Sequence, residues 1–203
     1  MDEVTNLKYV ILYRSFWAES AAALILGVIF SLYGYDVIAE KKKFDCLAIS
    51  GSTTPLAGTP ESLKKYGTRA VNVSSNFRYL LMGVSYCFVV ITAIIGPLHY
   101  YLLRRIILFE KNYFTIITIF HCIFAGCFLW MCVKIFDYRG SHPGKVCSGD
   151  YLQPDELTSS KFSSFVEAEK GSFLQIMMYL SVLGIVVSMC CLFCTVKVIT
   201  YAL

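Results

Sequence analysis

Four ionisable residues lie inside the long apolar stretches of the chain: Arg14, Glu19, His99 and His121. A charged side chain in hydrocarbon is costly, so these residues should face protein or water rather than lipid. At a helical rise of about 1.5 Å per residue, Glu19 lies about 15 Å and His121 about 12 Å from the starts of their stretches. Arg14 and His99 are shallower, at about 6–8 Å by the same rise. We therefore expect Glu19 to pair with His121, with Arg14 and His99 nearby.

Two roles fit this intramembrane polar cluster. One is a proton or cation path through the membrane, and the other is a buried polar clamp that fixes the register of the helices, with Arg14 reaching to the interface. A path needs polar groups in both leaflets, and the other half of the apolar stretches offers only small hydroxyls and Tyr86. The clamp is therefore favoured, and the path remains the alternative.

Small and polar residues recur at every fourth position of the first apolar stretch. A similar stripe lies along one face of the last apolar stretch. Small residues on one helix face let two backbones approach closely within a membrane. These stripes are therefore predicted to be contact surfaces between helices. The first contains Ser15, Glu19, Ala23, Gly27 and Ser31, and the second contains Ser181, Gly184, Ser188, Cys191 and Thr195.

Each of the two long polar segments contains a single cysteine, Cys46 or Cys147. In an oxidising compartment such a pair could form one disulfide between the segments. The first segment also holds the sequon Asn72-Val73-Ser74, which makes Asn72 a candidate N-glycosylation site. Both features favour an arrangement with the long segments outside the cytoplasm.

Three cysteines gather near the end of the last apolar stretch: Cys190, Cys191 and Cys194. Cysteines beside a membrane are candidates for S-palmitoylation, and simple packing of small apolar side chains is an equally good interpretation. No histidine or acid beside them completes a metal site. The cysteines of the other apolar stretches are expected to be inert: Cys87, Cys122, Cys127 and Cys132.

The sequence shows no constellation for catalysis. Its three histidines (His99, His121 and His142) form no zinc-binding pattern, and no glycine-rich phosphate loop is present. Residues 147–151 include a serine and an aspartate, but nothing sets a base against a nucleophile, so a structural turn is favoured. We predict a protein that is not an enzyme and that uses no cofactor or metal.

The elements that position these residues follow from composition. Of 203 residues, 57% are hydrophobic and only 16% are charged, with a mean hydropathy of +0.61, which is typical of an integral membrane protein. The net charge of +4 is scattered, so nucleic acid is not implied. We expect one all-α domain, a four-helix membrane bundle. Its predicted spans are residues 9–34, 77–103, 113–136 and 173–199, and its long loops are residues 36–76 and 137–172.

Four spans place both termini on one side of the membrane and both long loops on the other. The sequon, the loop cysteines and the basic connector between the second and third spans favour cytoplasmic termini. The lysines of the first long loop, such as Lys41, Lys64 and Lys65, argue for the opposite orientation. We prefer the plasma membrane or an endomembrane with cytoplasmic termini, and an organellar inner membrane is the alternative.

This layout of four spans, a short inner connector and two outer loops resembles the MARVEL and claudin-like tetraspan proteins. The resemblance covers the whole chain at the level of topology. The first loop lacks the tryptophan, Gly-Leu-Trp and paired cysteines of claudins, so no functional residue is transferred. What the resemblance implies is a protein that organises membranes or partner proteins without catalysis.

We therefore predict a tetraspan membrane protein that acts by lateral association in the lipid bilayer. It would be a homo-oligomer, or a structural subunit of a larger membrane assembly. A pore-forming or auxiliary ion-channel subunit is the first alternative. An accessory subunit of an organellar membrane complex is the second.

Overall fold

A computed structural model describes residues 3–105 and 110–202 of the chain. Side chains are described for residues 17–18, 20–93, 119, 122–187, 189–190 and 193. Helix accounts for 69% of the structure. The helical class predicted from the sequence is therefore confirmed.

Four long helices carry the predicted spans: α1 (Glu3–Gly34), α3 (Val73–Arg105), α4 (Glu110–Arg139) and α7 (Ala168–Ala202). Two of their segments, Val73–Ala93 and Ala168–Val187, are long and apolar enough to cross a membrane. Only 33% of each of these segments is buried. The core helix of a soluble protein is mostly buried, and these two segments are not.

The long helices extend beyond the spans predicted from hydropathy. The helix α3 begins at Val73, α4 continues to Arg139 and α7 begins at Ala168, each several residues into sequence predicted as loop. Backbone hydrogen bonds within a helix do not require apolar side chains, so a helix continues until its end groups are capped. Hydropathy therefore located the helices but not their ends.

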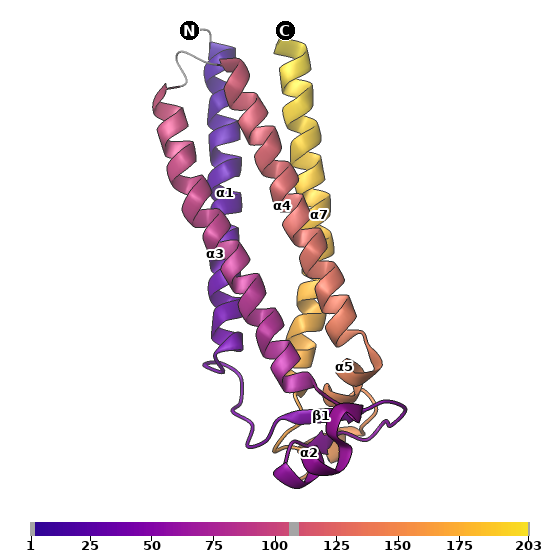
Figure 1. The fold of residues 1–203 in the computed structure, drawn as a ribbon. Helices are drawn as coiled ribbons and strands as arrows, with labels where there is room; N and C mark the ends of the chain where they lie inside the picture. The colour runs from indigo at the N-terminus through magenta and orange to yellow at the C-terminus, as the bar shows by residue number, and fades with distance from the viewer. Residues whose placement is uncertain (1–2, 106–109, 203) are drawn as a thin grey trace. The chain divides into compact units, whose positions relative to one another are not determined.

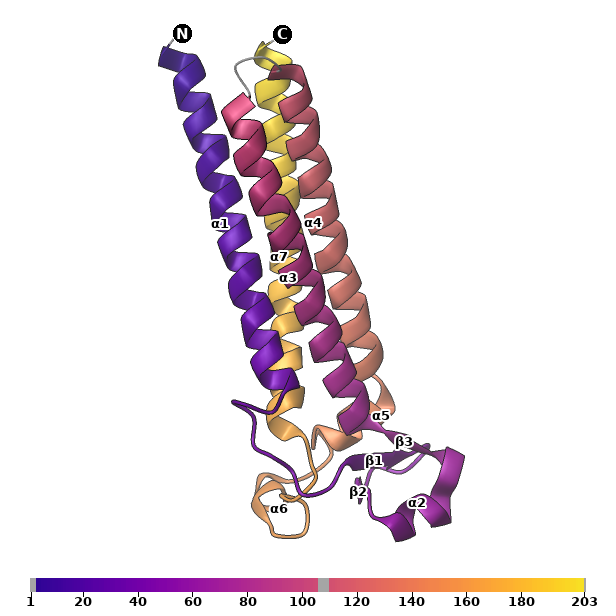
Figure 2. The same ribbon diagram turned by 60° about the vertical axis from the view of Figure 1, so that its left-hand side comes forward.

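The prediction of an all-α domain was wrong for the first long loop, which contains strands. Three short strands form an antiparallel sheet in the order β2-β1-β3: β1 (Cys46–Ile49), β2 (Leu56–Ala57) and β3 (Ala70–Asn72). In Figure 2 these strands lie beside the short helix α2 (Pro60–Tyr66). Strands of two to four residues are too short for a readable alternation of polar and apolar positions, so hydropathy could not reveal them.

The remaining elements are short. A 3₁₀ turn, η1, covers Gly67–Arg69, and the second long loop contains α5 (His142–Cys147) and α6 (Pro154–Thr158). Thr59 caps α2 and Ser141 caps α5, each by accepting a hydrogen bond from a backbone N–H of the first turn. Figure 1 shows α5 next to the end of α4.

The chain divides into two compact units, and each contains a stretch of all four long helices. The first unit is residues 1–29, 84–129 and 182–203, and the second is residues 30–83 and 130–181. The second unit therefore contains both long loops with the helix ends that flank them.

Small residues lie at the helix contacts of the first unit. Gly27 of α1 faces α3, where the Ser85 hydroxyl donates a hydrogen bond of 2.7 Å to its carbonyl oxygen. Gly184 of α7 faces α4, and a Cβ there would stand 2.8 Å from the ring of Phe128. Ala23 is also fully buried. These positions belong to the two stripes predicted from the sequence, and here the stripes do face neighbouring helices.

Aromatic residues fill the core of the second unit. Phe30 and Tyr33 of α1 pack on Phe173 of α7, and the rings of Tyr33 and Phe173 stack with centroids 3.9 Å apart. Gly34 is in close contact with Met82 of α3, because a Cβ on the glycine would lie 3.0 Å from the Met82 sulfur. Buried aliphatic side chains complete this core: Leu47, Leu81, Val146 and Leu174.

Candidate functional site

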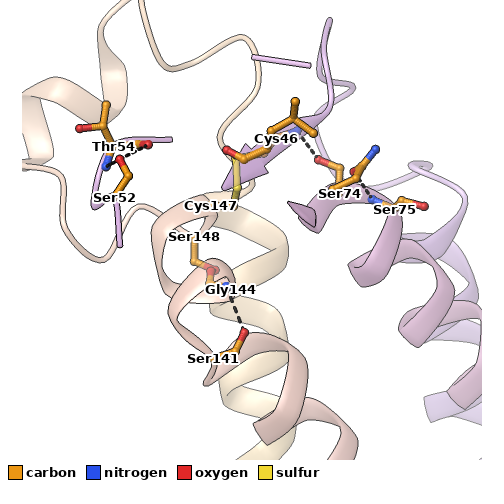
Figure 3. Close-up of a disulfide and its surroundings, with 11 residues drawn as sticks. Cys46, Ser52, Thr54, Ser74, Ser75, Ser141, Gly144, Cys147 and Ser148 are labelled. Atoms are coloured by element: carbon orange, nitrogen blue, oxygen red, sulfur yellow. Dashed lines mark hydrogen bonds between the residues drawn. A yellow bond between two sulfur atoms is a disulfide. The ribbon is translucent and has the colours of Figure 1, made fainter. Parts of the chain in front are cut away.

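A disulfide joins the two long loops, as the sequence predicted. It links Cys46 of β1 to Cys147 at the end of α5, 101 residues later, with Cα atoms 5.9 Å apart (Figure 3). Both cysteines are fully buried, and the Cys46 N–H donates to the hydroxyl of Ser74 at 2.8 Å. In the chain-entropy account, closing a loop of this length stabilises the fold by about 4–5 kcal/mol. The bridge thus fixes the two loops as one structure.

The sequon residues take part in the same structure. The Asn72 side chain caps α3, because its Oδ1 accepts a hydrogen bond of 2.9 Å from the Ser75 N–H. Its Nδ2 donates to the Asp45 carboxylate at 2.8 Å. The hydroxyl-bearing Ser74 is only 2% exposed. Glycosylation of Asn72 remains a prediction, and in this geometry a glycan would have to be attached before the loops fold.

An almost buried arginine ties the second loop to α4 and α7. Arg139 is 7% exposed, and its two terminal nitrogens donate to the two carboxylate oxygens of Asp150 at 2.8 and 2.7 Å. Its Nε donates to the Gly171 carbonyl oxygen at 2.9 Å. A planar fork on both oxygens is the strongest form of such a pair. The turn predicted around Asp150 is therefore held by Arg139, which follows the end of the predicted third span.

The close approach of Gly171 explains why a glycine stands there. A Cβ at this position would collide with the Ser148 side chain and lie 3.2 Å from the Arg139 Nε. The Ser148 hydroxyl itself donates to the Gly144 carbonyl oxygen at 2.8 Å (Figure 3). This serine is thus a structural residue, as the sequence analysis favoured for residues 147–151.

A second group of charges lies where α1 ends and α7 begins. The Lys170 ammonium contacts the carboxylates of Asp36 and Glu167, with 3.3 Å to Glu167. Arg78 of α3 donates to the other oxygen of Asp36 at 3.0 Å. Lys170 and Glu167 are each 3% exposed. The two acids and two bases carry equal and opposite charge. This neutral cluster joins the ends of α1, α3 and α7.

A third group of contacts between the loops involves the largely buried Lys42 and the exposed Glu40. Lys42 donates to the Glu40 carboxylate at 2.6 Å and to the Ser163 carbonyl oxygen at 3.2 Å. The hydrogen bond and the charge of Lys42 hold the pKa of the Glu40 carboxyl below its ordinary value. The Glu40 N–H in turn donates to the Glu169 carboxylate at 3.1 Å. The hydrogen bonds to Ser163 and to Glu169 add to the disulfide and the buried ion pairs.

His142, which the sequence left without a role, joins the two loops as well. Its Nε2 lies 3.0 Å from the Ser52 carbonyl oxygen, and its Nδ1 lies 3.4 Å from the Tyr151 hydroxyl. A carbonyl oxygen only accepts, so Nε2 carries the proton and donates. Where side chains are described, no three His, Cys, Asp or Glu residues come together as metal ligands.

Other predicted site residues fall outside the described side chains: Arg14, Glu19, His99, His121, Cys191 and Cys194. Cys190 is described and exposed on α7. The proposed polar cluster and the palmitoylation site therefore remain predictions. Sequence reasoning missed the pairs Arg139–Asp150 and Lys170–Asp36. Single charges in a loop give no sign of a partner that is distant in the sequence.

No family model, no curated protein sequence and no solved structure matches this chain. The resemblance to MARVEL and claudin-like proteins thus remains an expectation from topology.

Proposed function

We propose that the chain is a four-span integral membrane protein that acts by lateral association and not by catalysis. In this proposal α1, α3, α4 and α7 cross the bilayer. The disulfide-linked loops form a folded region on one face of it. The termini lie on the other face, which is the cytoplasm of a plasma membrane or endomembrane.

One observation carries the proposal: each of the long helices exposes several large apolar side chains, and small residues lie at some of the contacts between the helices. On α1, Ala23 and Gly27 are buried while Leu24, Ile25 and Val28 are exposed. The other helices show the same exposure: Val89 and Val90 of α3, Leu129 and Val133 of α4, and Val182, Leu183, Val186 and Val187 of α7.

Such a surface is unfavourable in water. Burying one large aliphatic side chain gains about 1.5–3 kcal/mol, so a helix that exposes several of them needs lipid or another protein around it. Packing through small residues with large apolar residues outward is how helices associate in a membrane. The helices are also long enough, since a span needs about 20 residues and even α4 has 30.

The fixed loop region supports association over catalysis. Its charges pair with one another, as Arg139 does with Asp150 and Lys170 with Asp36. A region held by a disulfide and these pairs presents a constant surface, which suits recognition of a partner protein or of a second copy. The channel alternative depends on Arg14, Glu19, His99 and His121, and no described contact favours it.

Two measurements on the full-length chain test the proposal. We expect the protein to stay in the membrane pellet after alkaline carbonate extraction. Release into the supernatant would reject membrane integration. After extraction in mild detergent, we expect the protein mass, corrected for bound detergent, to exceed the 22.9 kDa of one chain. A closed set of identical copies would indicate a scaffold, and a fixed set of different chains would indicate an accessory subunit. A single chain without partners would reject association.

A further inference from the structure

A cavity of about 220 Å³ lies where the end of α4, the helix α5 and the first turns of α7 meet. All of these segments belong to the second unit. The cavity is lined by both charged and apolar side chains. Its lining residues are Phe136, Arg139, Gly140, Lys145, Asp150, Gln175 and Met178.

The charges around the cavity leave one positive charge uncompensated. Arg139 and Asp150 neutralise each other, because both terminal nitrogens of the guanidinium donate to the two carboxylate oxygens. Lys145 is exposed, and its ammonium has no partner among the described residues. A cavity with one free ammonium beside a neutral pair favours an anion of single charge.

A second hydrogen-bond donor lines the same cavity. The Gln175 Oε1 accepts from Arg139 at 3.3 Å, so the amide nitrogen of Gln175 is the end that remains available to donate. Together, Lys145 and Gln175 offer donors from α5 and from α7. Phosphate oxygens are strong acceptors and bind well to an ammonium combined with a neutral donor.

The apolar residues of the lining indicate which kind of phosphate compound fits the cavity. Phe136 is 64% exposed at the end of α4, and Met178 of α7 also lines the cavity. Hydropathy predicts that the third span ends at residue 136 and the fourth begins at residue 173, so the cavity is at the depth of lipid headgroups. An acyl chain beside Phe136 and Met178 would cover apolar surface that a free phosphate ion would leave exposed.

We propose that this cavity binds the phosphate headgroup of an anionic phospholipid. The Lys145 ammonium and the Gln175 amide donate to the phosphate oxygens, and the glycerol end of the lipid lies against Phe136 and Met178. A headgroup held there would add a lipid contact to the segments that Arg139 joins. This inference rests on the proposed membrane location and names one ligand class for it.

The test uses the full-length protein, and its resistance to carbonate extraction is measured first. The purified protein in neutral detergent is titrated with short-chain phosphatidylglycerol, and bound lipid is counted by native mass spectrometry. We expect one tight site that prefers phosphatidylglycerol to phosphatidylcholine. Lys145→Gln should weaken it about tenfold, as expected for loss of one charge-assisted hydrogen bond. The matched control is Lys134→Gln, a half-buried lysine of α4 outside the cavity, which should bind like the wild type.

Each other outcome has a defined meaning. Equal weakening by Lys145→Gln and Lys134→Gln would show general attraction to positive charge and overturn the site. Unchanged binding in Lys145→Gln would overturn it too. Inorganic phosphate that displaces the lipid at equal concentration would assign the cavity to a soluble anion and overturn the lipid. Because carbonate resistance is measured first, these failures would leave the proposed membrane location standing.

Discussion

Asp36 forms an ion pair with Lys170, and its backbone has a conformation that is usually adopted by glycine. Its φ is +55°, and the N–H of Val37 bonds to the Leu32 carbonyl oxygen at 2.9 Å, the pattern that closes a helix with a left-handed residue. Glycine would adopt this conformation without strain but would provide no carboxylate. The aspartate therefore ends α1 and anchors α7 at the same point.

Removing the lysine of this pair should weaken the second unit. Lys170→Met would leave the buried Glu167 carboxylate without its partner, and breaking a buried pair costs about 3–5 kcal/mol. Thermal or denaturant unfolding in detergent, followed by circular dichroism, measures the loss. The control Lys64→Met changes an exposed lysine of α2 and should stay within about 0.5 kcal/mol. Equal stability of the two variants would contradict a structural role for Lys170.

Two helix glycines should respond in opposite ways to a single methyl group. Gly184→Ala places a Cβ against the Phe128 ring at 2.8 Å, and overpacking of this kind costs about 1–3 kcal/mol. Gly126→Ala meets no described atom within 4 Å, so we expect no loss of stability and a small gain from helix propensity. The unfolding midpoint of each variant in detergent provides the comparison. Loss of stability in Gly126→Ala alone would contradict the described packing of α4 against α7.

The disulfide should account for a large part of the stability of the loops. Cys46→Ser with Cys147→Ser removes the 101-residue closure, and we expect a loss of about 4–5 kcal/mol by the chain-entropy account. Protease digestion of the loops measures this, since the loops should become far more sensitive. Cys190→Ser, at an exposed cysteine of α7, should digest like the wild type. Free thiols found at both loop cysteines of the purified native protein would contradict the bridge.

The contact between Glu40 and Lys42 should disappear in acid. The folded pKa of Glu40 is lowered, chiefly by the hydrogen bond from Lys42, so its contribution is present above the ordinary Glu pKa of about 4.3 and is lost as pH falls through the lowered value. We expect Glu40→Gln to be slightly less stable than wild type at pH 7 and equal to it at acidic pH. The Glu40 carboxylate is exposed, so the difference should be small. A difference that grows in acid would contradict this sign.

Glycosidase treatment tests the orientation of the loops. If they face the secretory lumen, a lower apparent mass after treatment is expected for the wild type. Because the fold buries Ser74 and uses the Asn72 amide, we expect only part of the protein to carry a glycan. Asn72→Ser removes the acceptor and keeps a good helix cap for α3, so it is the matched variant. Labelling of Lys64 and Lys65 that requires permeabilisation of the plasma membrane alone, with the endomembranes kept intact, would contradict loops outside the cytoplasm.

Much of this architecture could be predicted because it depends on local composition. The long apolar stretches located the long helices, and the small residues Ala23 and Gly27 were placed at helix contacts. One cysteine in each long loop left a single obvious disulfide. Each of these signals is contained in a short piece of sequence.

The missing parts are those that depend on distant partners. The strand β1 exists because Leu47 pairs with Asn72 and with Leu56, and neither neighbour is visible from a four-residue segment. Arg139 and Lys170 looked like ordinary charges beside a span, and only the folded chain brings Asp150 and Asp36 to them. The intramembrane cluster of Arg14, Glu19, His99 and His121 remains a prediction.

The disulfide encloses the whole of α3 and α4, because these helices lie between Cys46 and Cys147 in the chain. A cut anywhere within that ring would leave one covalently connected molecule until a reductant separated the pieces. The same order of residues constrains biosynthesis. In a chain whose α3 and α4 cross the bilayer, Cys46 has to wait as a free thiol until both helices have been threaded. In such a chain, oxidation of this pair would be a chemical record that α3 and α4 had been inserted before the bridge closed.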